Sequence, residues 1–269
     1  MPRTHEHLRL KREAYMTWAR ANCGMIGRSP DFLNVMLAAL AAKRSFFAEA
    51  SPAGADAMVN YWKYIAKNDL FLTHALLDPQ LDKGKLRHQQ SDPGICLRVV
   101  DQNSDGLVLS GIKRIATAAP YADEILVWPF PPTFQAGEEA YANVFAVPMN
   151  SKGLKTICRV SYSNHGKRRD FPLSSRFDEM DATVVFDRVL VPWERVFVNQ
   201  NVPLLNRMYR ETRMRELTAH QTNARLEVKL GFVYALVQRL AEAQGLASRP
   251  EIMEMLGEAG GRIEMIRNT

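Results

Sequence analysis

Three segments in the first part of the chain carry hydrophobic residues at helical spacing. Residues 8–24, 30–47 and 55–68 place apolar side chains three or four positions apart, which predicts three helices. Ser29 and Pro30 stand at the start of the second segment. Serine is a favoured N-cap and proline a favoured first helical residue, so the second helix is predicted to begin at Pro30 with Ser29 as its cap.

The pattern then changes to short apolar runs separated by Asp, Asn, Gly and Pro, which predicts strands. Residues 71–77 form a short apolar run, and the strand candidates after it lie at residues 96–100, 106–112, 124–129, 143–147, 154–160, 181–186 and 189–191. Their close spacing leaves no room for crossover helices, which favours an antiparallel sandwich or barrel. The last two runs are expected to meet at a bend, and Pro192 is expected to end the sheet.

Helical spacing returns in the last part of the chain, most strongly across residues 219–245 and again across 251–265. The fold class is therefore α+β, with helices on either side of a central β-domain. The predicted division is an N-terminal helical segment at 1–70, the β-domain at 71–201 and the start of a C-terminal helical domain at 202–269.

Composition places the chain among soluble globular proteins, since 46% of its 269 residues are hydrophobic and 24% are charged. No apolar run is long enough to cross a bilayer, and no apolar stretch follows the first charges as in a secretory signal. Cys23, Cys96 and Cys158 are odd in number and far apart. These features predict a cytoplasmic protein with no disulfide framework, no Cys-x-x-Cys metal site and no membrane partner.

The basic charge of the chain does not single out a nucleic-acid surface. The net charge is +6 and the sequence pI about 9.3, but the basic residues are spread along the chain and mixed with acids. The densest basic clusters, at 167–169 and 207–215, are interpreted first as solvated faces. No nucleic-acid partner is predicted.

Residues 172–196 hold the most specific local pattern, PLSSRFDEMDATVVFDRVLVPWERV. This stretch closely resembles the end of the middle domain in the 4-hydroxyphenylacetate 3-monooxygenase family, the oxygenase component of two-component aromatic hydroxylases. That family shares its order of helices, β-domain and helices with the acyl-CoA dehydrogenase-like flavoproteins. The resemblance implies an acyl-CoA dehydrogenase-like fold that is incomplete, because the family has further helices beyond both ends of this chain.

The same resemblance implies an activity and its partners. Family members hydroxylate a phenol such as 4-hydroxyphenylacetate ortho to its hydroxyl, in aromatic compound catabolism, using O2 and reduced FAD from a separate flavin reductase. They assemble as homo-tetramers. The chain has no Gly-x-Gly-x-x-Gly fingerprint, which fits an enzyme that receives its flavin already reduced and does not bind NADH.

A loop arginine is the first candidate for the chemistry. Residues 25–32 read MIGRSPDF, which puts Arg28 just ahead of a predicted helix. On residue type alone, Arg28 either pairs with a surface acid or holds a carboxylate or phenolate. The resemblance implies that Arg28 is catalytic and binds the substrate. Phe32, a predicted substrate contact, stands where the family usually has a tyrosine and so lacks one hydroxyl.

A histidine in an apolar run is the second candidate. Such a residue is usually part of the core, but residues 68–80, NDLFLTHALLDPQ, resemble the family segment whose histidine faces the substrate hydroxyl. This resemblance implies that His74 is catalytic and binds the substrate. It also implies that Gln80, Asp82 and Lys83 lie in a loop that contacts the flavin.

A threonine that follows a predicted strand and turn is the last candidate. Residues 111–117, GIKRIAT, resemble a superfamily stretch whose threonine approaches the flavin ring, which makes Thr117 a predicted cofactor contact. Two other interpretations stay open. The chain is an inactive truncated remnant or interaction protein of the family, or it resembles the iron–sulfur 4-hydroxybutyryl-CoA dehydratases. The dehydratase ranks lower because Cys23 has no second cysteine within one helical turn.

Overall fold

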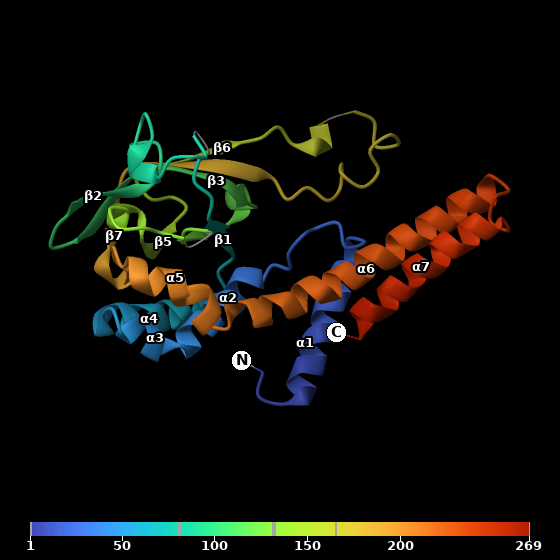
Figure 1. Ribbon diagram of the computed structural model, residues 1–269, viewed down its shortest axis with the longest axis horizontal. Helices are drawn as coiled ribbons and strands as arrows, with labels where there is room; N and C mark the ends of the chain where they lie inside the picture. The colour runs from blue at the N-terminus through green and yellow to red at the C-terminus, as the bar shows by residue number, and fades with distance from the viewer. Residues whose placement is uncertain (1, 80–81, 131–132, 165, 269) are drawn as a thin grey trace. The chain divides into compact units, whose positions relative to one another are not determined.

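The computed structural model describes residues 2–79, 82–130, 133–164 and 166–268 (Figure 1). The chain forms two compact units. The smaller unit contains residues 1–29, 165–178 and 216–269, and the larger contains 30–164 and 179–215. The division into domains at 1–70, 71–201 and 202–269 stays a prediction.

The described residues of the larger unit form four α-helices: α2 (Phe32–Ala42), α3 (Arg44–Ala48), α4 (Pro52–Asn68) and α5 (Val202–Glu211). The predicted start of the second helix is wrong, because α2 begins at Phe32 and its N-cap, Asp31, makes no side-chain cap bond. The serine–proline start is found instead at α4, where the Ser51 hydroxyl accepts a hydrogen bond from the Gly54 amide. The helix predicted to continue to residue 47 breaks at Lys43.

Two four-stranded sheets lie between α4 and α5 in the chain, which confirms the α+β class. The strands are β1 (Leu72–Ala75), β2 (Arg98–Gln102), β3 (Gly106–Thr117), β4 (Glu124–Val127), β5 (Val144–Pro148), β6 (Leu154–Cys158), β7 (Asp181–Pro192) and β8 (Val196–Val198). One sheet has the order β1-β4-β5-β8 and the other β2-β3-β7-β6. Among these strands every pair is antiparallel except β1 with β4, which is parallel. The connection between β1 and β4 contains β2 and β3 of the other sheet, and its described residues include short 3-10 helices but no α-helix.

The core of the larger unit lies between the two sheets. Both sheets contribute inward-facing apolar residues, and the Phe145 and Phe186 rings meet edge to face with centroids 6.0 Å apart. Helix α4 packs against β8, since a Cβ on Gly54 would lie 2.8 Å from the Phe197 carbonyl oxygen and the Tyr61 and Phe197 rings are 5.3 Å apart. The helices before the strands are thereby fixed to the last strand of the sandwich.

Two long strands, β3 and β7, carry local bends. Residues 106–117 form one continuous strand in which Ile115 has a φ of 57°, whereas the sequence predicted a strand followed by a turn. The two runs predicted to meet at a bend form the single strand β7, with Arg188 at a φ of 49° between them. Gly111 has a φ of 128°, and a Cβ there would lie 2.5 Å from the Cys96 carbonyl oxygen. The backbone of β3 therefore requires glycine at this position.

Replacing Gly111 with alanine is expected to lower the free energy of unfolding by roughly 1–3 kcal/mol, through strain at positive φ and the collision with Cys96. Urea denaturation followed by circular dichroism measures this change. Gly257→Ala in a helix is the control, because nothing lies within 4 Å of a Cβ there. Alanine also favours helix, so the control is expected to keep or raise stability. A loss of equal size in both variants contradicts the prediction.

The smaller unit is helical and consists mainly of α1 (His5–Ala21), α6 (Met214–Ala243) and α7 (Pro250–Arg267). Thr4 caps α1 by accepting a hydrogen bond from the His7 amide. The turn after α1 packs directly on α6, since a Cβ on Gly24 would lie 2.7 Å from Lys229 Cβ, and Arg225 donates to the Gly24 carbonyl oxygen at 3.2 Å. Only glycine allows this close approach.

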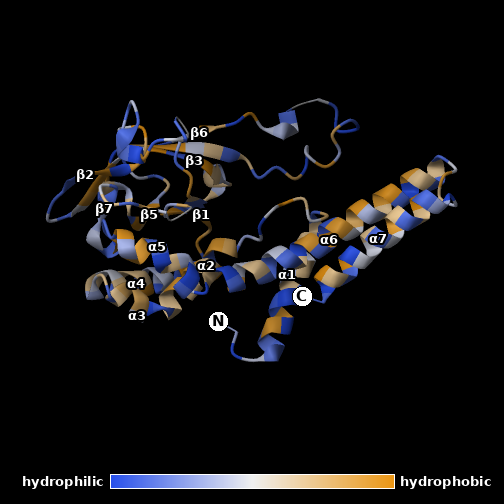
Figure 2. Ribbon diagram, viewed as in Figure 1, coloured by the Kyte–Doolittle hydropathy of each residue, from blue (hydrophilic) through white to orange (hydrophobic). Residues whose placement is uncertain are grey.

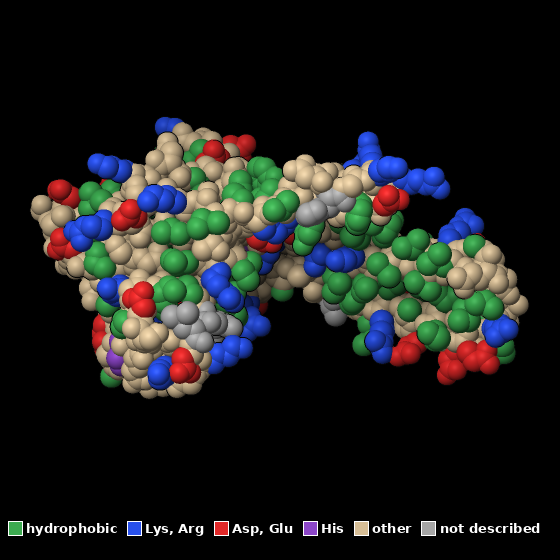
Figure 3. All heavy atoms as spheres, turned by 90° about the horizontal axis from the view of Figure 1, so that it is seen from above, with side chains coloured by type: hydrophobic (Ala, Val, Ile, Leu, Met, Phe, Trp, Pro, Cys, Tyr) green, Lys and Arg blue, Asp and Glu red, His purple; other side chains and the backbone are tan. Residues whose placement is uncertain are grey.

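Helices α6 and α7 run side by side and mix hydrophobic with polar residues along their lengths (Figure 2). Hydrophobic side chains gather on one face of this pair (Figure 3), where Val233, Val237 and Met255 are exposed and line a groove between the helices. In the part of the chain that the structure describes, none of the helices has the length and apolar content needed to span a bilayer. Cys23, Cys96 and Cys158 are free thiols.

Candidate functional site

His74 lies on β1 in the larger unit, where all four residues of the strand are buried. Its side chain is 5% exposed, and its ring stacks on the Trp128 indole with centroids 6.0 Å apart and an interplanar angle of 25°. The Trp128 indole N–H donates in turn to the Tyr209 hydroxyl of α5. Burial raises the pKa of Tyr209 to about 12, so this hydroxyl stays protonated at neutral pH. The His74 imidazole therefore stacks on the Trp128 ring, which is itself held in place by its hydrogen bond to Tyr209.

Thr117 is the last residue of β3, opposite Asp181 of β7. Its hydroxyl donates to Asp181 Oδ1 at 2.8 Å, and its carbonyl oxygen accepts a hydrogen bond from the Thr73 hydroxyl. Thr73 is the chain neighbour of His74 on β1. The structure therefore brings the strand of His74 and the end of β3 together.

The predicted flavin loop lies on the surface of the larger unit. Asp82 and Lys83 are both exposed. The Asp82 carboxylate accepts the Gly84 amide at 2.9 Å, and this hydrogen bond, with Lys85, lowers the pKa of Asp82 below its ordinary value. Gln90 bonds both the amide and the carbonyl oxygen of Asp82, which closes the loop on itself. Gln80 lies outside the described residues.

Arg28 and Phe32 belong to different units. Arg28 is half-buried in the turn after α1, in the smaller unit, so its approach to His74 stays a prediction. Phe32 opens α2 in the larger unit and is half-buried. Asn34, on the same helix turn, donates to the Leu70 carbonyl oxygen at 3.1 Å, just before β1. This bond holds the start of α2 near the strand of His74.

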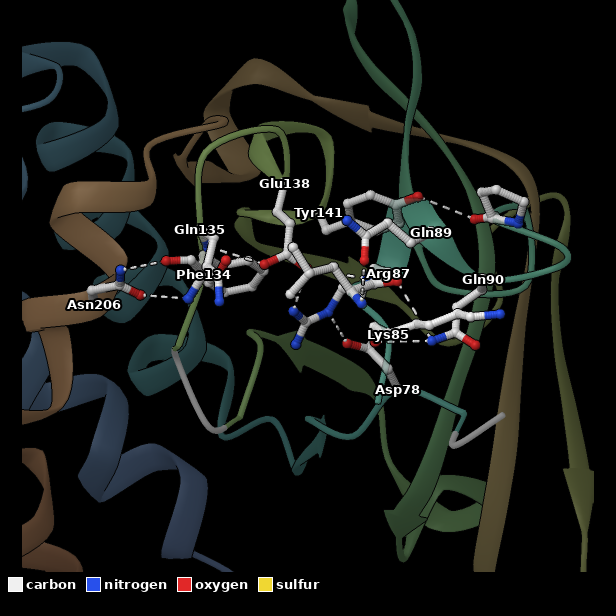
Figure 4. Close-up of polar contacts among 12 residues, drawn as sticks. Asp78, Lys85, Arg87, Gln89, Gln90, Phe134, Gln135, Glu138, Tyr141 and Asn206 are labelled. Atoms are coloured by element: carbon white, nitrogen blue, oxygen red, sulfur yellow. Dashed lines mark hydrogen bonds and ion pairs between the residues drawn. The ribbon is translucent and has the colours of Figure 1, made fainter. Parts of the chain in front are cut away.

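The larger unit also contains a largely buried network of charged side chains that was not predicted from the sequence. Figure 4 shows three of its members, Asp78, Arg87 and Glu138. Lys113 Nζ lies 2.6 Å from Asp78 Oδ1, Asp78 Oδ2 lies 2.6 Å from Arg87 Nε, and Arg87 contacts Glu138 Oε1 at 2.9 Å. Burial alone would raise the pKa of Asp78, but the charges of Lys113 and Arg87 outweigh it and lower that pKa. We call these four residues the charge network.

The position of Lys113 in its strand is a sequence feature that could have indicated this network. Along β3 the inward positions alternate, and Leu107, Leu109, Gly111 and Lys113 are all buried. A lysine at an inward position of a strand requires a buried acid. The identity of that acid could not be read from the sequence, because Asp78 lies on a loop 35 residues away.

The fold indicates which class of protein this chain resembles. Helices before and after a two-sheet sandwich resemble the folds of the oxygenase components of 4-hydroxyphenylacetate 3-monooxygenase and of acyl-CoA dehydrogenases. The family described as "4-hydroxyphenylacetate 3-hydroxylase N terminal" matches residues 1–198, and the chain belongs to this family.

Relatives with known names agree with this assignment. The oxygenase component of 4-hydroxyphenylacetate 3-monooxygenase from Geobacillus sp. is 40% identical over 271 residues, covering 100% of this chain and 54% of the relative. A crystal structure of such an oxygenase component, complexed with FAD and 4-hydroxyphenylacetate, has a TM-score of 0.91 and 39% identity, covering 99% of this chain and 55% of that one. The chain thus spans about half the length of the relatives it matches.

An archaeal 4-hydroxybutyryl-CoA dehydratase from N. maritimus shares the fold, with a TM-score of 0.80 over 97% of this chain and 52% of the dehydratase. Its identity is 18%, so this likeness concerns the fold alone. Within the described ranges, no group of three or more His, Cys, Asp and Glu side chains is placed to hold a metal ion.

Proposed function

We propose that this chain contributes the substrate and flavin contacts of a monooxygenase that uses reduced FAD and O2 to hydroxylate a 4-hydroxyphenylacetate-like phenol ortho to its hydroxyl. The observation that carries the proposal is a buried histidine stacked on Trp128, next to the end of β3, in a member of the 4-hydroxyphenylacetate 3-hydroxylase family. The relative solved with FAD and 4-hydroxyphenylacetate supports it, because 99% of this chain aligns with that structure at 39% identity.

The residues near Thr117 fit a flavin. Arg114 lies on the same strand, and its Nε atom is buried without a hydrogen-bond partner among the described residues. A buried cationic donor is costly unless a ligand supplies an acceptor, which the carbonyl oxygens or phosphates of FAD would do. The Thr117 hydroxyl oxygen, which donates to Asp181, still has lone pairs to accept a flavin N–H. Asp82, Lys83 and Gln80 are proposed as further flavin contacts.

Reduced FAD, when bound, would supply the electrons that activate O2 for transfer to the ring. In the proposed mechanism His74 accepts or shares the proton of the phenol hydroxyl, which makes the ring more nucleophilic. Trp128 fixes the imidazole plane, and the buried strand β1 excludes water from this side. Arg28 is proposed to hold and polarise the reacting oxygen atoms, and Phe32 to contact the aromatic ring.

Several parts of the proposal concern the whole protein. A separate flavin reductase supplies FADH2, the protein acts in the cytoplasm in aromatic compound catabolism, and the chains assemble as tetramers. The alternative interpretation, an inactive remnant or interaction protein of the same family, stays a prediction.

An assay of the purified chain separates the two functions. Reduced FAD is titrated into the chain without oxygen, and 4-hydroxyphenylacetate and O2 are then added while catechol product is measured by liquid chromatography and mass spectrometry. Binding of FADH2 and catechol above the flavin-only background support the oxygenase. The same assay is repeated with the C-terminal part of the Geobacillus relative added. Absence of both binding and catechol in both mixtures refutes the oxygenase and favours the interaction protein.

A further inference from the structure

Two loops of the larger unit meet at the charge network. The first, residues 82–90, contains the predicted flavin contacts Asp82 and Lys83, and the second, residues 133–141, lies next to it (Figure 4). Arg87 comes from the first loop and Glu138 from the second, while Asp78 ties them to Lys113 on β3. We propose that the charge network is a positioning device that clamps both loops to β3 and thereby sets where the flavin-contacting segment lies. This proposal rests on the proposed function.

The first loop depends on Arg87 for its anchor. Residues 82–85 are exposed, and the loop's other bonds, such as those of Gln90 with Asp82, are internal to it. Arg87 points inward, where its side chain is 18% exposed and bonds Asp78 and Glu138 at once. Leu86 is the one aliphatic residue of this loop and is half-buried, so the loop gains much of its fixed position from the charge-assisted bonds of Arg87.

The second loop is fixed from both sides. The Glu138 side chain is fully buried and accepts hydrogen bonds from the Arg87 side chain and from the Gln135 amide. The Phe134 ring lies under the Arg87 guanidinium, 4.4 Å away. On its other side Phe134 exchanges two backbone bonds with the Asn206 side chain of α5, at 2.9 and 3.0 Å. Arg87 and α5 therefore hold this loop between them.

The same helix also supports His74. Asn206 and Tyr209 lie three residues apart on α5, hence on one face of it, and Tyr209 holds the Trp128 ring on which His74 stacks. A shift of the first loop is passed through Arg87 to Phe134 and then to α5. Loss of the network is therefore expected to loosen both loops together while leaving His74 on its buried strand.

The test uses variants that first unbalance and then rebalance the charges of the network. Two cations face two carboxylates, and the Lys113 side chain, 4% exposed, has Asp78 as its ion-pair partner and the Leu76 carbonyl oxygen as a second acceptor. Asp78→Asn keeps the shape of the side chain and removes its charge, which leaves Lys113 buried beside a neutral amide. Adding Lys113→Met removes the surplus cation and restores the balance.

Hydrogen exchange and anaerobic titration with reduced FAD are measured on the chain and three variants. Asp78→Asn is expected to raise exchange in both loops and to weaken FADH2 binding about tenfold, equivalent to ~1.4 kcal/mol. The double variant with Lys113→Met is expected to regain most of the protection and affinity. Asp187→Asn is the matched control, because its ion pair with Lys155 is exposed, and it is expected to change neither measurement.

Exchange that rises in one loop only, or a double variant no better protected than Asp78→Asn, overturns the clamp. Increased exchange in both loops with unchanged FADH2 affinity overturns its role in positioning the flavin segment. If the unmodified chain binds no FADH2 either alone or with the C-terminal part of the Geobacillus relative added, the proposed function fails instead, and the role assigned toward the flavin falls with it. The exchange measurements then still decide whether the charge network clamps the two loops.

Discussion

Replacing Glu124 with alanine is expected to lower the free energy of unfolding by about 3–5 kcal/mol, because it removes one partner of a buried ion pair. Glu124 is 2% exposed and accepts hydrogen bonds from the Tyr61 hydroxyl at 2.7 Å and from Arg195. Burial, reinforced by the Glu124 charge, raises the pKa of Tyr61 above its ordinary value, so the tyrosine remains a donor. Alanine would leave the Arg195 charge, 18% exposed, without its carboxylate.

Urea denaturation measures this loss, with two variants as references. Tyr61→Phe removes one donor and leaves the ion pair, so a smaller loss of about 1–2 kcal/mol is expected. Asp187→Ala removes a carboxylate from an exposed pair and is expected to cost less than about 1 kcal/mol. If Glu124→Ala lowers the free energy of unfolding by no more than Asp187→Ala does, the prediction that burial makes the Glu124–Arg195 pair important for stability is wrong.

Replacing His74 with alanine is expected to lower the rate of catechol formation by about 10²–10⁴-fold, the range of a lost general acid–base group. Arg28→Ala is expected to act in the same direction, since it removes the donor proposed to polarise the reacting oxygens. The stacking partner of His74, Trp128, is buried and bonded to Tyr209, so the position of the Trp128 ring is expected to survive the change. FADH2 affinity should then change much less than the rate.

The measurement is catechol per turnover of added FADH2, together with hydrogen peroxide released. A shift from catechol to peroxide in His74→Ala with unchanged FADH2 affinity supports a role at the phenol. The same shift with weakened FADH2 affinity indicates lost flavin binding, because unbound FADH2 also reduces O2 to hydrogen peroxide. His5→Ala, an exposed histidine of α1, is the control and is expected to leave both products unchanged. Full catechol formation by His74→Ala would remove this residue from the mechanism.

The sequence was informative where local chemistry decides the structure. Runs of β-branched residues located the strands, and the sandwich followed from their spacing. Helix boundaries were less accurate, because the Ser29–Pro30 and Ser51–Pro52 pairs look alike and only the second caps a helix. The parallel pairing of β1 with β4 depends on contacts between residues 52 positions apart, such as Leu72 with Glu124, which no local pattern encodes.

The candidate site was also predicted only in part from the sequence. His74 was predicted in an apolar run, and its burial agrees with that pattern, but its partner Trp128 comes from a distant strand end. The charge network was missed because its members are far apart in sequence, and a lysine or glutamate alone reads as surface. The family resemblance supplied the roles of Arg28 and Thr117, which no spacing argument would have given.

The packing of α4 on β8 also has a consequence for folding during synthesis. Gly54 and Tyr61 rest on Phe197, a residue made more than a hundred positions later. At ribosomal rates of about 5–20 residues per second, the first helices wait on the order of ten seconds for that strand. During this interval the side of α4 that will pack on β8 has no partner strand. We therefore expect chaperones to bind the nascent chain before the sandwich forms.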